Sequence, residues 1–275
     1  MIVVLVSGGK DSTASLVLAL EEFGNREVIG IFTDTGWEAE CTYRYLDYLE
    51  NKLGVRILRL RNERWNGLLD LIEKKKRFPS ALFRFCTAHF KIVPVAEFLA
   101  NTDIPIKEIW IGIRRDESRS RKKRYSAYLS DATYDYHEWL SSVSGGDVRK
   151  AIIERIKEKN IKIRFPILDW SSEDVLTFLA RRGITLNPLY LRGHRRVGCY
   201  PCVLGSLNEF RLCWKDEEGK RNIIRFAEVE NRLRSRGYMA RLKDGMTAKQ
   251  LIKRLEQQDL QLDMFCEESC EICRI

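Results

Sequence analysis

Six consecutive residues near the N-terminus have the types and spacing to hold the phosphates of a nucleotide: Ser7-Gly8-Gly9-Lys10-Asp11-Ser12. Glycines let the backbone approach an anion closely, and the N–H groups at the start of a helix favour negative charge. Lys10 adds a mobile positive charge, the two serines add hydroxyl donors, and Asp11 could help to hold a magnesium ion. The GxxxxGK[ST] spacing of a Walker A loop is absent. The segment therefore predicts another kind of phosphate loop, for ATP with Mg²⁺, in which Lys10 and Asp11 act in catalysis.

Cysteines form the second chemically suggestive group, because the chain contains eight of them. Cys199 and Cys202 form a CxxC motif, and thiolates at that spacing converge on one metal. We expect Cys86 to add a third ligand, with Cys213 as the candidate for the fourth and the cysteines of the C-terminal tail as the alternatives. Four cysteines suit a 4Fe–4S cluster, and zinc would accept the same thiolates. Dithiol redox chemistry and purely structural cysteines are the remaining alternatives.

The C-terminal tail carries three further cysteines, Cys266, Cys270 and Cys273, close to the chain end. A mobile tail with redox-active or persulfide-bearing thiols fits this spacing, and Cys270 is the candidate for a catalytic role. The alternative interpretation is a disordered end whose thiols have no function.

Basic residues give the chain a net charge of +9, which favours acidic partners such as nucleotides, polyphosphates or nucleic acids. They are concentrated in Arg114–Arg124. Guanidinium groups bind phosphate or sulfate bidentately, so we expect the anion ligands to be Arg114, Arg115 and Arg119, and we expect Arg115 to act in catalysis as well. Lys122, Lys123 and Arg124 are interpreted either as a solvated loop or as contacts to a DNA or RNA backbone. A second basic patch, beside the CxxC motif, consists of Arg192, Arg195 and Arg196.

Short β-branched runs alternate with helical stretches, which predicts βαβ units and a parallel sheet. The predicted strands are Ile2–Val6, Val28–Thr33, Val55–Leu60, Glu108–Ile113 and Lys162–Leu168. The predicted helices are Asp11–Phe23, Glu38–Leu53, Ala88–Ala100 with a kink at Pro94, and Ser171–Arg182 with a capping box formed by Ser171 and Asp174. The fold class is therefore α/β, with five or six parallel strands and helices on both faces.

The domain organisation is predicted as a nucleotide-binding domain over residues 1–205 and a small helical appendage with a cysteine-rich tail over residues 206–275. Residues 120–150 are polar and are expected to form an insertion beside the sheet. No apolar run approaches the ~18 residues that a spanning helix needs. No signal peptide is visible either, so we expect a cytoplasmic protein without a membrane partner.

Several sequence blocks carry a family resemblance. After SGGKDS they are Phe32–Gly36, Cys86-Thr87 with Lys91 and Pro94, Gly112–Arg119, Pro166–Trp170, Asn187–Tyr190 and Gly198–Cys202. In this order they resemble the phosphoadenosine phosphosulfate (PAPS) reductase family of the PP-loop ATP pyrophosphatases, from residue 1 to about residue 205. The resemblance implies an adenine nucleotide alpha-hydrolase-like fold, with Asp34, Thr35 and Gly36 in the adenosine pocket.

Two departures from the reductases bear on function. Their phosphate loop is usually degraded, whereas this one is intact, and their Glu-Cys-Gly tail is replaced here by Glu268-Ser269-Cys270-Glu271. The chain is therefore more similar to the DNA phosphorothioation ATPases and phage-type members. This implies cleavage of ATP to AMP and pyrophosphate, transfer of sulfur from a donor such as a cysteine desulfurase or a reductant, and DNA or RNA as an acceptor. The alternatives are a sulfonucleotide reductase and a nucleotide-binding subunit of a larger complex.

Overall fold

The computed structural model describes residues 1–243 and 245–257 of the chain. These residues divide into two compact units. Unit 1 consists of Met1–Arg64 and Phe85–Gly198, and unit 2 consists of Trp65–Arg84 with the described residues from Cys199 onward. The sequence predicts one boundary after residue 205, whereas in the structure residues 65–84 also group with the C-terminal helices.

Unit 1 is built on a six-stranded sheet in the order β3-β2-β1-β4-β6-β5. The strands are β1 (Ile2–Leu5), β2 (Val28–Asp34), β3 (Ile57–Arg61), β4 (Glu108–Ile111), β5 (Thr133–Asp135) and β6 (Lys162–Arg164). All neighbouring pairs are parallel except β5 with β6. The chain runs outward from β1 to β3 and then returns to β4 on the other side of β1. This reversal is a topological switch point, where open α/β sheets bind ligands at the carboxyl ends of their strands.

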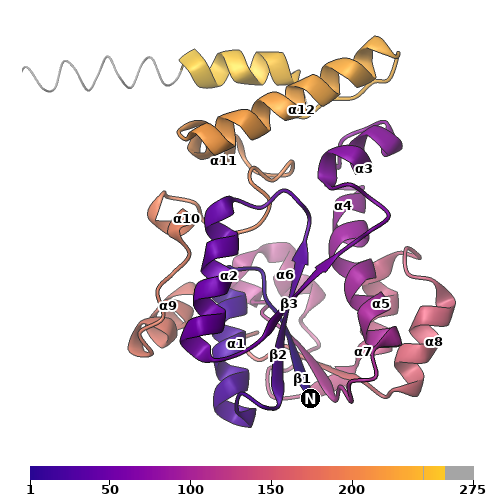
Figure 1. Cartoon of the computed structure of the whole chain (residues 1–275), viewed down its shortest axis with the longest axis vertical. Coiled ribbons are helices and arrows are strands. Elements are labelled where there is room, and N and C mark those ends of the chain that lie inside the picture. Colours follow the sequence, from indigo (N-terminus) through magenta and orange to yellow (C-terminus); the bar gives the residue numbers. More distant parts are fainter. Residues whose placement is uncertain (244, 258–275) are drawn as a thin grey trace, which may run out of the picture. The chain divides into compact units, whose positions relative to one another are not determined.

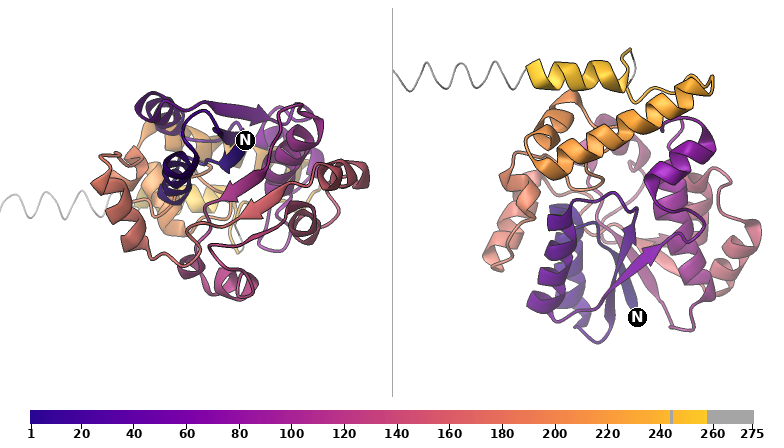
Figure 2. Two further views of the ribbon diagram at one scale, coloured as in Figure 1. Left: turned by 90° about the horizontal axis from the view of Figure 1, so that it is seen from below. Right: turned by 45° about the horizontal axis from the view of Figure 1, so that its top comes forward.

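Helices cover both faces of this sheet (Figures 1 and 2). One face carries α1 (Lys10–Phe23), α2 (Glu40–Leu53) and α9 (Ser172–Arg181), and the other carries α5 (Val93–Asn101), α7 (Tyr136–Ser144) and α8 (Lys150–Glu158). The shorter helical segments are α4 (Phe85–Thr87), η1 (Ala88–Ile92), η2 (Arg115–Glu117), α6 (Arg119–Arg124) and α10 (Pro188–Leu191). Within the described part of the chain, no helix has both the length and the apolar character to cross a membrane.

The core of unit 1 consists of two apolar clusters, one on each face of the sheet. Ile2 and Val4 of β1 belong to the cluster with α1 and α2, while Val3 belongs to the cluster with α5 and α8. Successive side chains of a strand point to opposite faces, so a central strand buried on both sides is apolar throughout. Burial on both faces explains the continuous apolar run from which the first strand was predicted.

Two local predictions have clear outcomes. The predicted capping box at the start of α9 is confirmed, because the Ser171 N–H donates to Asp174 Oδ2 over 2.7 Å and the Asp174 N–H donates to Ser171 Oγ over 3.0 Å. Pro94 lies in the first turn of α5, directly after the π-helix η1. Because Ile92 and Val93 both keep helical backbone angles, the predicted helix is continuous, and Pro94 lies at the junction of its π-helical and α-helical parts.

The polar region over residues 120–150, predicted as an insertion, adds structure to the sheet itself. It contains α6, β5, α7 and the start of α8. Strand β5 pairs antiparallel with β6, with Thr133 opposite Arg164 and Asp135 opposite Lys162. The sheet is therefore mostly parallel with one antiparallel edge strand.

Unit 2 is helical. Its elements are α3 (Leu68–Lys75), α11 (Leu207–Trp214), α12 (Glu217–Ser235) and a helix over residues 248–257. Phe78, which follows α3, packs edge-on against Phe226 of α12 with ring centroids 5.8 Å apart. Arg232 of α12 donates to Glu73 of α3 over 3.0 Å. These contacts explain why residues 65–84 group with the C-terminal helices.

Candidate functional site

The phosphate loop joins β1 to the start of α1. The Ser7 N–H donates to Ser12 Oγ over 3.0 Å, and Ser12 Oγ donates to the Gly9 carbonyl over 2.9 Å. Gly8 has a φ of +74°, and a Cβ there would lie only 2.9 Å from Thr42 Cγ2. A side chain at this position would therefore be strained and would clash with α2. The loop's own hydrogen bonds and its two glycines fix its shape.

Lys10, Asp11 and Arg114 meet at the switch point of the sheet. Asp11 Oδ1 accepts from Lys10 Nζ over 2.8 Å and from Arg114 Nε over 2.8 Å. Arg114 follows β4 and is only 4% exposed. A Cβ at Gly112 would lie 2.6 Å from the Asp11 carbonyl oxygen, so this glycine lets the end of β4 approach the start of α1. The result is a cluster of two cations and one carboxylate beside the phosphate loop.

Tyr190 of α10 contacts the same loop, a contact that the sequence does not predict. The Lys10 backbone N–H donates to the Tyr190 hydroxyl over 2.9 Å. Asn187, which is fully buried, holds α10 in place by accepting from the Leu189 N–H over 3.0 Å and donating to Thr42 Oγ1 over 3.3 Å. Burial raises the pKa of Tyr190, against a lowering from the Lys10 N–H, so the hydroxyl stays protonated at neutral pH. Tyr190 therefore occupies the first backbone donor of α1, one of the groups that a helix offers to an anion.

We expect Tyr190→Phe to tighten nucleotide binding about two- to tenfold. The substitution removes the competing acceptor from the Lys10 N–H, and a neutral hydrogen bond contributes roughly 0.5–1.5 kcal/mol. Titration of the purified protein with ATP and with a non-hydrolysable analogue would measure the change in affinity.

A suitable control is Tyr48→Phe, because the Tyr48 hydroxyl also accepts from a backbone N–H, that of Thr185, over 2.9 Å. Nucleotide affinity should be unchanged in this variant. Weaker binding by Tyr190→Phe alone would mean that the hydroxyl itself contacts the nucleotide, which would contradict the competition that we infer.

A second loop follows β2 at the same edge of the sheet and contains Asp34, Thr35 and Gly36. Asp34 Oδ1 accepts from the Gly36 N–H and from the Tyr43 hydroxyl, each over 2.7 Å, and Asp34 Oδ2 pairs with Arg61 at 3.0 Å. Gly36 has a φ of +67°, as the turn requires. These contacts hold the second loop rigidly, beside the phosphate loop that follows the neighbouring strand β1. The predicted contact of the second loop with adenosine stays a prediction.

Glu38 is buried under this second loop and organises it. Its carboxylate accepts from Thr35 Oγ1 over 2.8 Å and from the Thr35 N–H over 3.1 Å. Burial raises the pKa of Glu38 above its usual range, while Lys91 and these hydrogen bonds act in the opposite direction. Burial likewise raises the pKa of Tyr43, whose neighbours Glu38 and Asp34 add to the effect. The sequence predicted Glu38 as the first residue of a helix, whereas α2 begins at Glu40 and Glu38 folds back onto the loop.

The other two predicted anion ligands, Arg115 and Arg119, have different surroundings from Arg114. The guanidinium of Arg115 donates to the Tyr125 carbonyl over 3.1 Å and to the Tyr128 carbonyl, and it pairs with Asp169. Arg119 is exposed at the start of α6. The structure thus gives Arg115 contacts that fix the chain after α6. Its predicted catalytic role, and the anion-binding role of Arg119, stay predictions.

The predicted metal ligands fall in both units. Cys86 belongs to unit 1, whereas Cys199, Cys202 and Cys213 belong to unit 2. Across residues 1–243 and 245–257, no three His, Cys, Asp or Glu side chains form a group that could hold a metal ion. Cys213 is buried in α11, and burial, together with Glu209 and Asp216, raises the pKa of its thiol. The four predicted ligands are divided between the two units, and their assignment to one cluster stays a prediction. Cys266, Cys270 and Cys273, including the predicted catalytic cysteine, lie outside the described residues.

Known proteins resemble the chain over most of its length. It is 31% identical to an uncharacterised protein of Escherichia phage 186, over 83% of this chain and 74% of the phage protein. It is also 31% identical to an uncharacterised protein of Methanocaldococcus jannaschii, over 84% of this chain but 43% of that protein. An adenosine 5′-phosphosulfate reductase of Streptomyces coelicolor is 29% identical, over 63% of this chain and 60% of the reductase. The chain therefore spans less than half of the archaeal relative's length.

A family model matches the region that contains every contact of the phosphate loop described above. The model describes the phosphoadenosine phosphosulfate reductase domain, and it covers residues 1–204. This range includes the loop itself, Arg114 and Tyr190. On this match, the chain belongs to the phosphoadenosine phosphosulfate reductase domain family.

Proposed function

We propose that this chain is an ATP pyrophosphatase that adenylates an acceptor for sulfur transfer, forming AMP and pyrophosphate. One observation carries the proposal: the complete Ser7–Ser12 loop, in which Lys10 is retained and is held beside Asp11 and Arg114 at the start of α1. A loop that only bound a sulfonucleotide would not need a lysine aimed at a departing pyrophosphate. The 29% identity to an adenosine 5′-phosphosulfate reductase supports the assignment to nucleotide-linked sulfur chemistry.

The proposed reaction has two displacements. An oxygen of the acceptor attacks the α-phosphorus of ATP, the bond from that phosphorus to the α–β bridging oxygen breaks, and pyrophosphate leaves. A sulfur nucleophile from the donor then attacks the acceptor atom that carries the adenylated oxygen. The bond from this atom to oxygen breaks, and AMP leaves with the electron pair.

This chain's own residues act mainly on the charge that develops in the first displacement. Lys10 lies at the start of α1, where its ammonium group can move from Asp11 to the pyrophosphate oxygens. Arg114 keeps Asp11 oriented when Lys10 leaves, because its Nε donates to the same carboxylate oxygen. Fixed donors and cations of this kind stabilise a transition state without reorganising during the reaction.

The proposed reaction uses magnesium, but it does not use an iron–sulfur cluster. Asp11 supplies one carboxylate, and its Oδ1 is shared by Lys10 and Arg114. Magnesium is commonly held by one or two carboxylates plus substrate phosphates, so this donor set fits the ion, which when bound would neutralise the phosphate charge. The 4Fe–4S cluster, with zinc as its alternative, remains a prediction from the sequence. Its four predicted ligands are divided between the two units, and the two displacements above require none of them.

The test is to incubate the purified full chain with ATP and Mg²⁺, and separately with PAPS or adenosine 5′-phosphosulfate and a thiol reductant. We expect AMP and pyrophosphate from ATP, with turnover rising when candidate acceptors are added. Chromatographic separation of AMP from ADP identifies which phosphate bond is cleaved.

A sulfonucleotide reductase is the second candidate, and the identity to an adenosine 5′-phosphosulfate reductase favours it. In that case the protein would release sulfite from a sulfonucleotide and form no AMP from ATP with any acceptor. This outcome would overturn the proposed function.

A further inference from the structure

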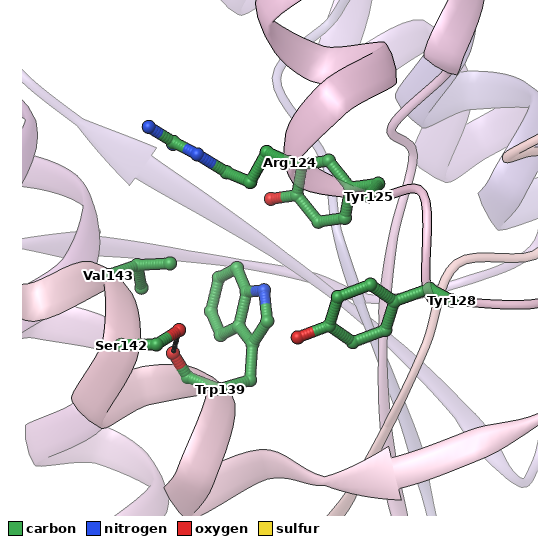
Figure 3. A pocket seen from close by; sticks show the side chains of 6 residues that line it. All are labelled: Arg124, Tyr125, Tyr128, Trp139, Ser142 and Val143. Carbon is green, nitrogen blue, oxygen red and sulfur yellow. Dashed lines mark hydrogen bonds between the residues drawn. The ribbon is translucent and has the colours of Figure 1, made fainter.

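The region between β4 and α8 contains a cavity that the phosphate loop does not use. Its volume is about 400 Å³. It is lined by Arg124, Tyr125, Tyr128, Trp139, Ser142 and Val143 (Figure 3). These residues come from the end of α6, the loop that follows it, and α7. We call this cavity the aromatic cavity.

Three rings form the walls of the aromatic cavity, and other rings hold them in place. Tyr125 and Tyr128 both pack against Phe165 with centroids 5.2 Å apart. Trp139 is stacked on Tyr136 at 5.8 Å. Tyr125 is buried, whereas Tyr128 and Trp139 are partly exposed. A partly open cavity with fixed aromatic walls favours a flat ring that can stack.

A strongly basic helix, α6, ends at the aromatic cavity. Arg124, the last residue of α6, is exposed and lines the cavity. Five of the six residues of α6 are basic, namely Arg119, Arg121, Lys122, Lys123 and Arg124, and one of them, Arg121, pairs with Glu117. Lys122 and Lys123 are exposed. This row of charge exceeds what the phosphate of one mononucleotide needs, so it favours a ligand with several successive phosphates.

The aromatic cavity is connected to the phosphate loop through two adjacent arginines. Arg114 donates to Asp11 beside the loop, over 2.8 Å. Arg115 holds the backbone of the cavity wall through the Tyr125 and Tyr128 carbonyls. In addition, Thr133, just after this wall, pairs with Arg164 at the carboxyl end of β6. The cavity and the phosphate loop therefore lie at the same edge of one sheet.

We propose that the aromatic cavity binds an unpaired base of a single-stranded nucleic acid, while the basic side chains of α6 bind the adjoining phosphates. Stacking on aromatic rings beside a positive groove is the general physical basis for binding single strands. A base inside a duplex is already stacked on its neighbours and cannot enter such a cavity. Such binding does not depend on the proposed function, whereas a role for the bound strand as the sulfur acceptor rests on it.

The test uses the full chain and a fluorescein-labelled single-stranded oligonucleotide of roughly 12 nucleotides, followed by anisotropy without ATP. We expect Trp139→Ala to weaken binding about five- to 150-fold, the range for loss of one stacked base. Because Trp139 also packs in the protein, a second variant is needed. Ser142→Phe adds a ring from an exposed rim position, fills the cavity and should weaken binding without removing any core contact.

The salt dependence of binding by two variants separates the contribution of stacking from that of charge. Arg124→Ala should reduce the slope of log affinity against log salt by about one, whereas Ser142→Phe should leave this slope unchanged. The matched control is Lys157→Ala, which removes an exposed cation on α8, away from the cavity, and should leave affinity unchanged.

The proposal would be overturned if Trp139→Ala and Ser142→Phe bound the oligonucleotide as tightly as the wild type, or if the duplex of the same sequence bound equally well. Equal competition by a mononucleotide would likewise exclude a strand as the occupant. None of these readouts depends on ATP cleavage. Intact single-strand binding by a protein that forms no AMP would therefore refute the proposed function and leave the aromatic cavity assignment standing.

Discussion

Lys10→Ala is expected to lower AMP and pyrophosphate formation about 100- to 1,000-fold while leaving the protein folded. This is the usual effect of removing one fixed donor from a charge that develops in a transition state. The fold should persist because Asp11 keeps its second partner, Arg114, at 2.8 Å. The rate of pyrophosphate release, measured at saturating ATP and at low ATP, would show whether the lysine acts on binding or on the chemical step.

Lys157→Ala again serves as the control, since it removes a lysine of the same unit that is exposed on α8. Its turnover should equal that of the wild type, and both variants should retain the wild-type circular dichroism spectrum. Full turnover by a folded Lys10→Ala variant would show that the phosphate loop does not carry the reaction.

The phosphate loop could be predicted from the sequence because its determinants are local. A short β-branched run, two glycines and a helix-forming stretch are contiguous, and the structure places β1, the loop and α1 within one residue of the predicted bounds. The capping box of α9 was predictable for the same reason. Each of these features depends on residues only a few positions apart.

The partners of the loop could not be predicted, because they come from distant parts of the chain. Tyr190 is 180 residues away from Lys10 in sequence, and nothing in its neighbourhood marks its hydroxyl as a partner of a backbone N–H. Arg114 and Arg115 are identical and adjacent, so side-chain chemistry cannot distinguish them. The fold distinguishes them, since Arg114 is directed at Asp11 and Arg115 at the Tyr125 and Tyr128 carbonyls.

The grouping of residues 65–84 with the C-terminal helices could not be predicted, for a related reason. Residues 65–84 contain a short amphipathic helix whose apolar partner cannot be identified from its own sequence. The structure supplies that partner in α12, through Phe226 and Arg232. Antiparallel β5 was missed because three residues flanked by polar segments give too little alternation for a strand to be recognised.

Glu230→Ala is expected to be the most destabilising single substitution considered for unit 2, at about 3–5 kcal/mol. Glu230 lies in α12 and is fully buried. Its Oε1 accepts from the Leu242 N–H over 2.7 Å, and its Oε2 accepts from the Ala248 N–H over 2.6 Å. Ala248 is the first residue of the helix over residues 248–257, so the carboxylate caps that helix from another element. Truncation would leave two buried N–H groups without an acceptor and a cavity beside them.

The measurement should report on unit 2 alone, because two units need not unfold in a single transition. Hydrogen exchange of the Leu242 and Ala248 amides meets this requirement, and both should exchange faster in the variant.

Glu230→Gln keeps one acceptor oxygen and should lose about half as much stability, with the Leu242 and Ala248 amides affected unequally. Glu228→Ala is the matched control: it removes an exposed carboxylate two residues earlier on the same helix and should change stability by no more than about 0.5 kcal/mol. If Glu230→Ala proved no more destabilising than this control, the Glu230 carboxylate would not be the group that holds Leu242 and Ala248 against α12.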